Sequence, residues 1–327
     1  MFQIAIIIFA VLLFIFGVVV FVDVLLAKKN NTKYHTKQVI TAFLFILPAA
    51  IFAFFFIALP ILYSLGYAFT DTGLFEPDGG KFIGFENFKA AFEEIKNGGT
   101  LAIAIKNTAI FVVLVVPLQI TVALLLALFC NVKYKGRTIF KVCFFAPVVI
   151  SLAVTSYLWL ILLDPSSDGL MNTILMSFGL PQQEFLRNPD TTMIWIVIVS
   201  AWQGAGYQML IFSSALSGIR KDLYEAARMD GCNAWKRFWK VTLPGLKPTL
   251  LYILITVFIG ACRIMVQPML MVGSYDPKAI TISYFMYGQA YDFPYLVGYS
   301  SAIALLMTIF TGTITFLQRK LLGEKRK

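Results

Sequence analysis

Seven blocks of apolar residues, each about long enough to cross a lipid bilayer, constrain this 327-residue chain more than any other feature. A transmembrane helix needs about 20 consecutive, mostly apolar residues to cross a hydrocarbon layer roughly 30 Å thick. The expected spans are residues 2–26, 40–69, 108–130, 142–163, 193–219, 250–271 and 299–317. The sequence therefore predicts an all-α, polytopic membrane protein with about seven transmembrane helices.

The composition supports this class of protein. Hydrophobic residues make up 59% of the chain and charged residues 13%, whereas a soluble domain averages about 45–50% apolar and about 25% charged residues. The segment 279–291 is too short and too polar to cross, so we expect it to lie outside the bilayer or to dip into it. Residues 1–27 are expected to form an extra N-terminal transmembrane helix and residues 28–39 a cytoplasmic linker. Residues 40–322 then form the main transmembrane domain, and residues 323–327 a cytoplasmic tail.

Basic residues gather on one side of the predicted topology. The segments 27–38, 131–141, 220–248 and 318–327 hold 20 of the 27 Lys and Arg residues and only 4 of the 17 acidic residues. Because loops rich in Lys and Arg stay in the cytoplasm, we expect the N-terminus outside the cell and the C-terminus in the cytoplasm. The net charge of +10 then reflects orientation and contact with anionic membrane lipids. A nucleic-acid partner is not expected, because the basic residues are divided among four segments.

Residue patterns typical of enzymes and metal sites are missing from the sequence. The four cysteines form no CxxC pair and the one histidine is His35, so we expect no metal site. There is no GxxxxGK[ST] phosphate loop, and Gly204 and Gly206 lack the third glycine and the preceding strand of a dinucleotide-binding turn. We therefore predict a chain that is not an enzyme and binds no cofactor. Asp23 is the only acid inside a predicted span, which argues against a proton- or sodium-coupled carrier.

The longest predicted cytoplasmic loop, residues 220–248, has the pattern of two short amphipathic helices. Asp222 and Glu225 have the spacing of a capping box at the start of the first helix, and Gly231 is expected to turn the chain. The second helix carries three aromatic residues on one face and is expected to end at two prolines: Trp235, Phe238 and Trp239, then Pro244 and Pro248. Aromatic side chains on such a face need a partner protein or the underside of the membrane.

This loop resembles the EAA loop of the permease subunits of binding-protein-dependent ABC importers. The resemblance rests on a long pattern with fixed spacing: Glu225-Ala226-Ala227, Gly231, Val241 and Leu243-Pro244. In that family the loop docks into a cleft of a cytoplasmic ATPase and transmits its closure. The resemblance implies a coupling role for Glu225, Ala226, Ala227, Asp230, Gly231, Leu243 and Pro244. An ordinary amphipathic connector is the alternative.

Further motifs over residues 40–322 are similar to those of carbohydrate permeases of the maltose and glycerol-phosphate type. They are the stretch 82–88 (FIGFENF), Asn107-Thr108, Pro147, Trp159, Gly169, Asn172, Tyr284, Tyr287, Gly298 and Tyr299. The segment 272–277 keeps only one Gly and the Pro of the T-x-G-G-P pattern found in that family. The resemblance implies a permease in the plasma (inner) membrane that imports a sugar or oligosaccharide from an extracellular solute-binding protein. It also implies a second homologous permease subunit and two cytoplasmic ATPase subunits, which would bind the ATP.

Five polar or aromatic residues inside the spans are candidates for the substrate pathway. A charge at mid-membrane costs about 2.5–3.5 kcal/mol on insertion scales, so Arg263 needs a function, and Gln267 is expected one helical turn further along the same face. Trp202, Gln203 and Tyr207 form a second cluster. These side chains suit sugars, although bonding between helices is an alternative role. A permease for a polyol, glycerol phosphate or phosphodiester, a membrane scaffold and a self-powered carrier are the alternatives for the whole chain.

Overall fold

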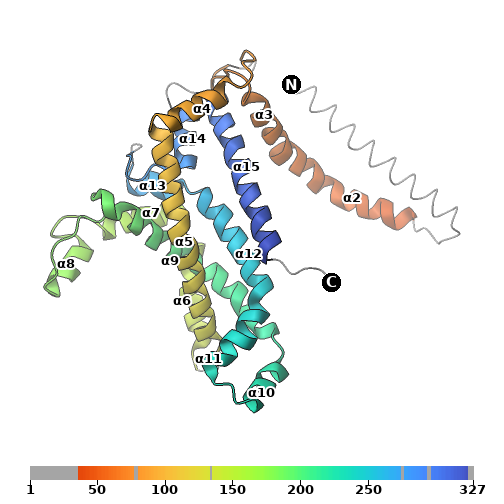
Figure 1. Ribbon diagram of the computed structural model, residues 1–327, viewed down its shortest axis with the longest axis vertical. Helices are drawn as coiled ribbons and strands as arrows, with labels where there is room; N and C mark the ends of the chain where they lie inside the picture. Colours follow the sequence, from red (N-terminus) through yellow and green to blue (C-terminus); the bar gives the residue numbers. More distant parts are fainter. Residues whose placement is uncertain (1–35, 77–79, 133–134, 274–275, 293–295, 323–327) are drawn as a thin grey trace.

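The computed structural model describes residues 36–76, 80–132, 135–273, 276–292 and 296–322, and Figure 1 shows that this part of the chain is built from helices. The first half holds α2 (Thr36–Ala53), η1 (Phe54–Ala58), α3 (Leu59–Tyr67), α4 (Glu86–Lys96), α5 (Thr100–Asn131), α6 (Arg137–Val149), α7 (Leu152–Leu162) and α8 (Leu170–Ser177). The second half holds α9 (Pro189–Gly218), α10 (Lys221–Met229), α11 (Ala234–Arg237), η2 (Phe238–Thr242), α12 (Leu243–Cys262), α13 (Val266–Met271), α14 (Ile282–Tyr291) and α15 (Val297–Leu322).

Five helical stretches in the described residues are long and apolar enough to cross a membrane, and a bent pair could make a sixth. The five are Leu44–Tyr67, Thr100–Asn131, Pro189–Gly218, Ala234–Cys262 and Val297–Leu321. This confirms the all-α, polytopic class. The predicted first span at 2–26, most of the predicted linker at 28–39 and the tail at 323–327 lie outside the described residues, so the count of seven stays a prediction.

The prediction of one continuous span over 142–163 is wrong, because the chain bends by 99° between α6 and α7. Ile150 and Ser151 have extended backbone angles, and the Ser151 Oγ accepts a hydrogen bond from the backbone N–H of Val154 at 3.3 Å. Ser151 is therefore the N-cap of a new helix. An apolar run does not reveal such a break, because the residues on both sides stay apolar.

The predicted span 250–271 is also wrong at both ends. The helix already begins in the loop 220–248, since α11, η2 and α12 follow one another without a break up to Cys262. The π-helical turn η2 redirects the backbone hydrogen bonds just before Pro244, and the N–H of Leu243 donates to the carbonyl of Phe238. The prolines Pro244 and Pro248 consequently do not end this helix, contrary to expectation.

The main hydrophobic core lies where α5 packs along α9 and α12. Small residues let the backbones approach closely, as is usual between membrane helices. A Cβ atom on Gly204 would lie 2.3 Å from the Nε2 of Gln119, and one on Gly206 would lie 2.3 Å from the carbonyl oxygen of Phe144 in α6. The two glycines that resembled part of a nucleotide-binding turn therefore serve helix packing.

Buried asparagines at the resemblance motifs fasten loops to helix ends. Asn87 donates from Nδ2 to the carbonyl oxygens of Ala68 at 3.0 Å and Thr70 at 2.8 Å. Asn172 donates to the carbonyl of Gln183 at 3.0 Å and accepts a hydrogen bond from its N–H at 2.9 Å. These side chains satisfy backbone groups that have left the helical pattern, so both motif positions have a structural role.

The segment 279–291 does not cross the bilayer, and most of it forms the ten-residue helix α14. Asn107 of α5 donates from Nδ2 to the carbonyls of Pro277 at 2.8 Å and Ile280 at 3.0 Å. The adjacent Thr108 accepts a hydrogen bond through Oγ1 from the N–H of Ile282 at 3.0 Å. The Asn107-Thr108 pair thus holds this segment against α5, with α15 packed on its other side.

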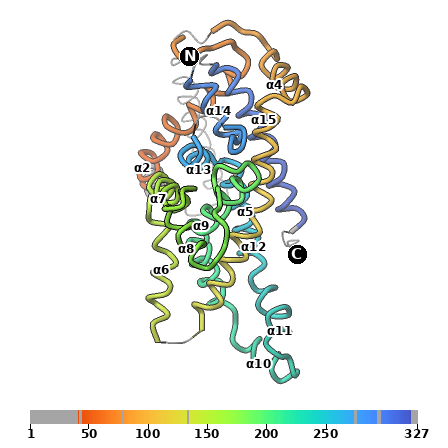
Figure 2. Tube along the Cα trace, turned by 90° about the vertical axis from the view of Figure 1, so that its left-hand side faces the viewer, coloured from red at the N-terminus to blue at the C-terminus, as the bar shows by residue number. Residues whose placement is uncertain are grey.

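The molecule has two distinct ends and one outlying helix. Helices α10 and α11 lie together at one end, and α4 lies at the opposite end in both views (Figures 1 and 2). Helix α2 runs away from the bundle (Figure 1). It leads into the apolar stretch Leu44–Tyr67, and only 11% of the most apolar window of that stretch is buried. Its flank is therefore available to lipid or to another chain.

We expect Gly206→Ala to destabilise the protein, because the added methyl group would collide with the backbone of α6. Overpacking of this kind costs about 1–3 kcal/mol, and it should lower the melting temperature of the detergent-purified chain by several degrees. Gly312→Ala is the matched control, since a Cβ there meets nothing within 4 Å and alanine favours a helix. Equal melting temperatures for the two variants would contradict this account of the α6–α9 contact.

Candidate functional site: a cavity between the helices and the loop 220–248

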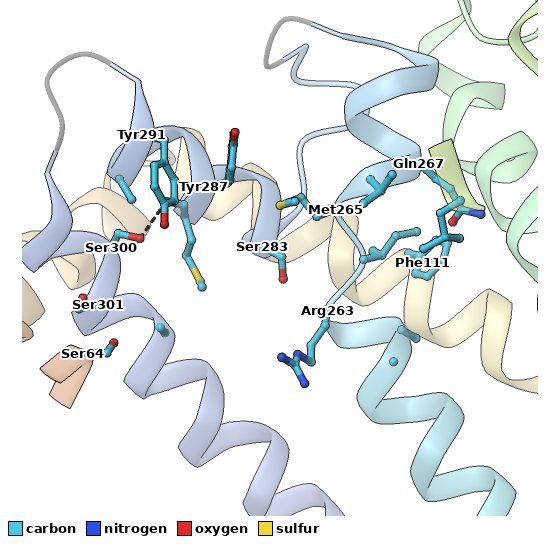
Figure 3. Close-up of a pocket in the computed structure, with 18 of the residues that line it drawn as sticks. Ser64, Phe111, Arg263, Met265, Gln267, Ser283, Tyr287, Tyr291, Ser300 and Ser301 are labelled. Atoms are coloured by element: carbon cyan, nitrogen blue, oxygen red, sulfur yellow. Dashed lines mark hydrogen bonds between the residues drawn. The ribbon is translucent and has the colours of Figure 1, made fainter. Parts of the chain in front are cut away.

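A cavity of about 1030 Å³ opens between α3, α5, α9, α12, α13, α14 and α15. Its polar lining residues are Tyr63, Ser64, Tyr67, Gln119, Ser200, Gln208, Thr256, Arg263, Gln267, Ser283, Tyr287, Tyr291, Ser300 and Ser301. Figure 3 shows side chains from α14 and α15 on one side and from the α12–α13 region on the other. A cavity of this kind can surround a polar solute with hydrogen-bonding groups and aromatic faces.

Arg263 lies at the point where α12 stops. It is the C-cap of α12, and the backbone leaves the helical pattern over Arg263, Ile264 and Met265 before α13 begins. The carbonyl of Ile264 is satisfied by the Oγ1 of Thr281 at 2.7 Å. The guanidinium of Arg263 points into the space between α12 and α15 (Figure 3).

The expectation that Gln267 shares a helix face with Arg263 is wrong, because the helix break separates them. Gln267 lies on α13 and is buried. Its Oε1 accepts a hydrogen bond from the Ser200 Oγ at 2.6 Å, and its Nε2 donates to the Gln203 Oε1 at 3.2 Å. Gln267 therefore lines the cavity and also ties α13 to α9.

Gln203 continues this network behind the cavity wall. Its Nε2 donates to the carbonyl of Ile150 at 3.1 Å and to the Thr155 Oγ1 at 3.1 Å. The same amide thus reaches α13 through Gln267 and the bend between α6 and α7 through Ile150. A buried chain of satisfied polar groups fixes the relative position of the helices that it joins.

The structure separates the five predicted pathway residues into two groups. Arg263 and Gln267 line the cavity, and Gln203 contacts it only through Gln267. Trp202 packs edge to face on Trp159 with ring centroids 5.5 Å apart, and Tyr207 is half exposed elsewhere on α9. Neither Trp202 nor Tyr207 is a lining residue. Substrate contact by any of the five stays a prediction.

Two pairs of tyrosines in the cavity wall were not among the predicted pathway residues. Tyr63 and Tyr67 on α3 stack with centroids 6.2 Å apart, and Tyr287 and Tyr291 on α14 lie 5.0 Å apart. Figure 3 shows the latter pair on the wall opposite Gln267. Each pair has the spacing i, i+4 that places side chains on one helix face, and this spacing is a signal that was present in the sequence.

A buried glutamine pair joins the two core helices in the cavity wall. The Nε2 of Gln119 on α5 donates to the Oε1 of Gln208 on α9 at 3.0 Å. Both side chains also line the cavity. They present amide groups in a wall that the neighbouring residues make largely apolar.

The loop 220–248 forms the expected pair of helices with a bend. Gly231 has a φ of +72° between α10 and α11, a left-handed conformation that glycine adopts without steric cost. Asn233 is the N-cap of α11, and its Oδ1 accepts a hydrogen bond from the N–H of Lys236 at 2.9 Å. The Tyr224 hydroxyl contacts the Thr242 Oγ1 at 3.0 Å and braces α10 against η2.

The expected capping box at the start of α10 is not formed. Arg220 is the N-cap and its side chain makes no capping bond. Asp222 lies in the first turn, where it pairs with Arg220 and its negative charge favours the positive end of the helix dipole. The helix therefore begins two residues earlier than the spacing of Asp222 and Glu225 predicts.

The loop presents an accessible surface that includes several apolar side chains. Of the seven predicted coupling residues, Glu225, Ala226, Asp230, Gly231 and Pro244 are exposed, Leu243 is half-buried and Ala227 is buried. Exposed apolar residues accompany them: Met229 is 89% exposed, Trp235 68% and Trp239 50%. An apolar patch of this kind at the end of a molecule marks an interaction surface.

In the described residues, no group of three or more His, Cys, Asp or Glu side chains could hold a metal ion. The apolar helices, the cavity between them and the accessible loop at one end of the bundle are those of a multi-pass membrane protein.

Residues 105–326 match the family described as "Binding-protein-dependent transport system inner membrane component", and the chain belongs to this family. The probable ABC transporter permease protein YurN of Bacillus subtilis is 30% identical over 286 residues, 86% of this chain and 95% of the relative. The lactose transport system permease protein LacF of Rhizobium radiobacter is 31% identical over 288 residues, 85% and 93% of the two chains.

A solved structure has the same fold. A chain of a bacterial ABC transporter involved in the import of the acidic polysaccharide alginate superposes with a TM-score of 0.77. It covers 89% of this chain and 98% of that chain at 24% sequence identity. The comparison establishes the helical fold of an ABC importer permease for this chain, which is a transport subunit in the inner membrane.

We expect Gln203→Leu and Gln267→Leu each to destabilise the protein, because each leaves buried polar partners without a hydrogen bond. An unsatisfied buried group costs about 1–3 kcal/mol. The double variant should lose less stability than the sum of the two single variants, because both single variants remove the same hydrogen bond between Gln203 and Gln267. Thermal unfolding of the purified protein measures this, and strictly additive losses would show that the two amides act independently.

Proposed function

We propose that this chain is the permease subunit of an ATP-driven importer for a sugar or oligosaccharide. With a second, homologous permease it forms the pathway for a solute delivered by an extracellular binding protein. The observation that carries this proposal is the cavity, which is lined by two tyrosine pairs and by serine and glutamine side chains. Aromatic faces cover the apolar C–H surface of a sugar ring, and the polar groups bind its hydroxyls.

The names of two relatives support a carbohydrate as the transported solute. The arabinooligosaccharides transport system permease protein AraP of Bacillus subtilis is 31% identical over 246 residues, 74% of this chain and 77% of the relative. A lactose permease protein stands at similar identity. A membrane scaffold would not need a polar chamber between its helices, so this alternative is disfavoured.

Phosphorylated solutes are the second candidate. The sn-glycerol-3-phosphate transport system permease protein UgpA of Rhizobium meliloti is 35% identical over 174 residues, 53% of this chain and 57% of the relative. The arginine in the cavity suits a phosphate as well as a sugar. A phosphate ester is therefore kept as an alternative to a neutral saccharide.

The proposed mechanism is alternating access without covalent chemistry in this chain. Two cytoplasmic ATPase subunits bind and hydrolyse ATP, and the loop of α10 and α11 docks on them. The accessible surface of this loop includes Glu225, Ala226, Asp230 and Gly231, which are available for contact with a partner. Closure of the ATPase pair then moves α12, which continues directly from this loop to the cavity.

We place the α10–α11 loop and the C-terminus in the cytoplasm, with the N-terminus outside. The proposal rests on the asymmetry of the basic residues, and it is supported by the position of α4 at the opposite end of the molecule (Figure 2). Acidic residues predominate in the loops assigned to the outside, which hold 12 of the 17 acids.

Cys232, in the turn between α10 and α11, tests this orientation. A membrane-impermeant maleimide should modify it in inverted vesicles stripped of peripheral proteins and leave it unmodified in intact spheroplasts, as read by peptide mass spectrometry. Asp168→Cys, in an exposed loop assigned to the outside, should show the reverse pattern. Modification of Cys232 in spheroplasts would invert the proposed topology.

We expect Gly231→Val to abolish co-purification of the ATPase, because valine disfavours the left-handed turn by roughly 1–2 kcal/mol and would redirect α10. The measurement is a mild-detergent pull-down of the tagged chain from its native membrane, followed by mass spectrometry. Wild type should bring down an ATPase, a second permease and, when solute is present, a binding protein. Glu225→Lys should also lose the ATPase by reversing a charge on the docking surface.

Gly136→Val is the matched control for this pull-down. Gly136 also has a positive φ and open space around its Cβ position, but it lies before α6 in a different loop. The control should keep the ATPase. Loss in both variants would indicate misfolding rather than a coupling role, and wild-type chain that comes down alone would remove the importer proposal.

A further inference from the structure

We propose that the solute admitted to the cavity is acidic: a saccharide that carries a carboxylate or a phosphate ester, with this anionic group bound by Arg263. The inference rests on the proposed function and adds the chemical class of the solute. It is carried by the charge distribution in the cavity wall.

Arg263 is the one charged side chain among the described residues that line the cavity. The remaining polar groups there are neutral hydroxyls and amides, so the described wall offers no carboxylate to balance the guanidinium. The ion pairs within the described part of the chain join Lys89 to Glu93, Arg220 to Asp222 and Lys278 to Asp276. Arg263 belongs to none of them.

The position of Arg263 makes this unbalanced charge significant. A guanidinium stays protonated in proteins, and a charge among apolar membrane helices is costly unless it is paired or faces a water-filled space. Here it follows directly after the apolar helix α12 and is exposed to the cavity rather than to the outer surface of the loops. A positive potential in a cavity with low-dielectric walls concentrates anions.

The shape of the guanidinium narrows the chemistry of the solute. Its planar fork donates two parallel hydrogen bonds to a carboxylate or a phosphate, which a neutral hydroxyl cannot accept in the same way. Ser283 projects from α14 into the same part of the cavity as Arg263 (Figure 3), and its hydroxyl is a further hydrogen-bonding group for a solute there.

The size of the cavity and its other residues indicate that the anion is attached to a saccharide. A volume of about 1030 Å³ is at the upper end of the roughly 300–1,000 Å³ typical of small-molecule sites. The tyrosine pairs at 63/67 and 287/291 give aromatic surfaces in the same cavity wall, and Figure 3 shows the second pair apart from Arg263. An inorganic anion would leave most of this surface unused.

The test uses the whole importer, purified with its partner subunits in lipid nanodiscs. The probes are oligouronates from partially hydrolysed pectin and alginate, the same pools after carboxyl reduction to neutral sugars, and the phosphate esters glucose 6-phosphate and glycerol 3-phosphate. Native mass spectrometry reads the retained solutes. The variants are Arg263→Gln, Arg263→Lys and, as a control arginine in another loop, Arg137→Gln, which is exposed at the start of α6.

We expect wild type and Arg137→Gln to retain acidic solutes at least about tenfold better than their neutral counterparts. Arg263→Gln should remove this preference, because truncating one partner of a desolvated charge pair weakens binding by roughly tenfold or more. Arg263→Lys should retain part of it, since lysine keeps the charge but loses the fork. Oligouronates and phosphate esters are separate arms, so the result also tells which anion is bound.

Several outcomes would overturn the inference. They are equal or better retention of the neutral pools, retention of no solute, or an unchanged acidic preference in Arg263→Gln. A carboxylate of the second permease that pairs with Arg263 would produce one of these results, because it would neutralise the guanidinium. ATP hydrolysis stimulated by the binding protein, measured on the same preparation, reports the proposed function separately: if it persists while the neutral pools bind, only the acidic class of the solute fails.

Discussion

The structure depends on one constraint: a backbone group inside a membrane must find its hydrogen bond within the protein. Helices satisfy this requirement except where they stop, and this chain stops two of them inside its apolar runs. At one break the carbonyl of Ile150 is bound by Gln203, and at the other the carbonyl of Ile264 is bound by Thr281. Gln203 and Thr281, whose side chains bond to these carbonyls, are joined to cavity-lining residues, Gln267 and Ile264. The helix breaks therefore bring polar groups to the neighbourhood of the cavity.

The helical class and the approximate positions of most spans could be predicted, because length and hydropathy decide whether a segment can cross a bilayer. The breaks could not be predicted in this way. Ile150 and Ile264 are as apolar as their neighbours, and a change of backbone angle leaves hydropathy unchanged. At Pro244 the sequence predicts a helix end that does not occur, because the π turn of η2 lets the helix continue past this proline.

The candidate site was predictable only where a single residue was unusual by itself. Arg263 and Gln267 were found because polar groups are rare in a membrane span. Tyr63 was missed because an aromatic residue is unremarkable within an apolar block, and Tyr287 because its short helix was set aside as a segment that does not cross. Their meeting in one cavity depends on α15, which packs against both α14 and the distant α3, and no local pattern contains the second of these contacts.

The unbroken helical path from Ala234 to Cys262 links two places that have been considered separately. Its 29 residues correspond to a rod roughly 40 Å long at about 1.5 Å per residue. Trp235 lies at one tip and Arg263 directly follows the other. Over this length a tilt of a few degrees about the tryptophan end displaces the arginine end by several ångströms. The charge in the cavity is therefore at the far end of a long helix whose other end belongs to the loop 220–248.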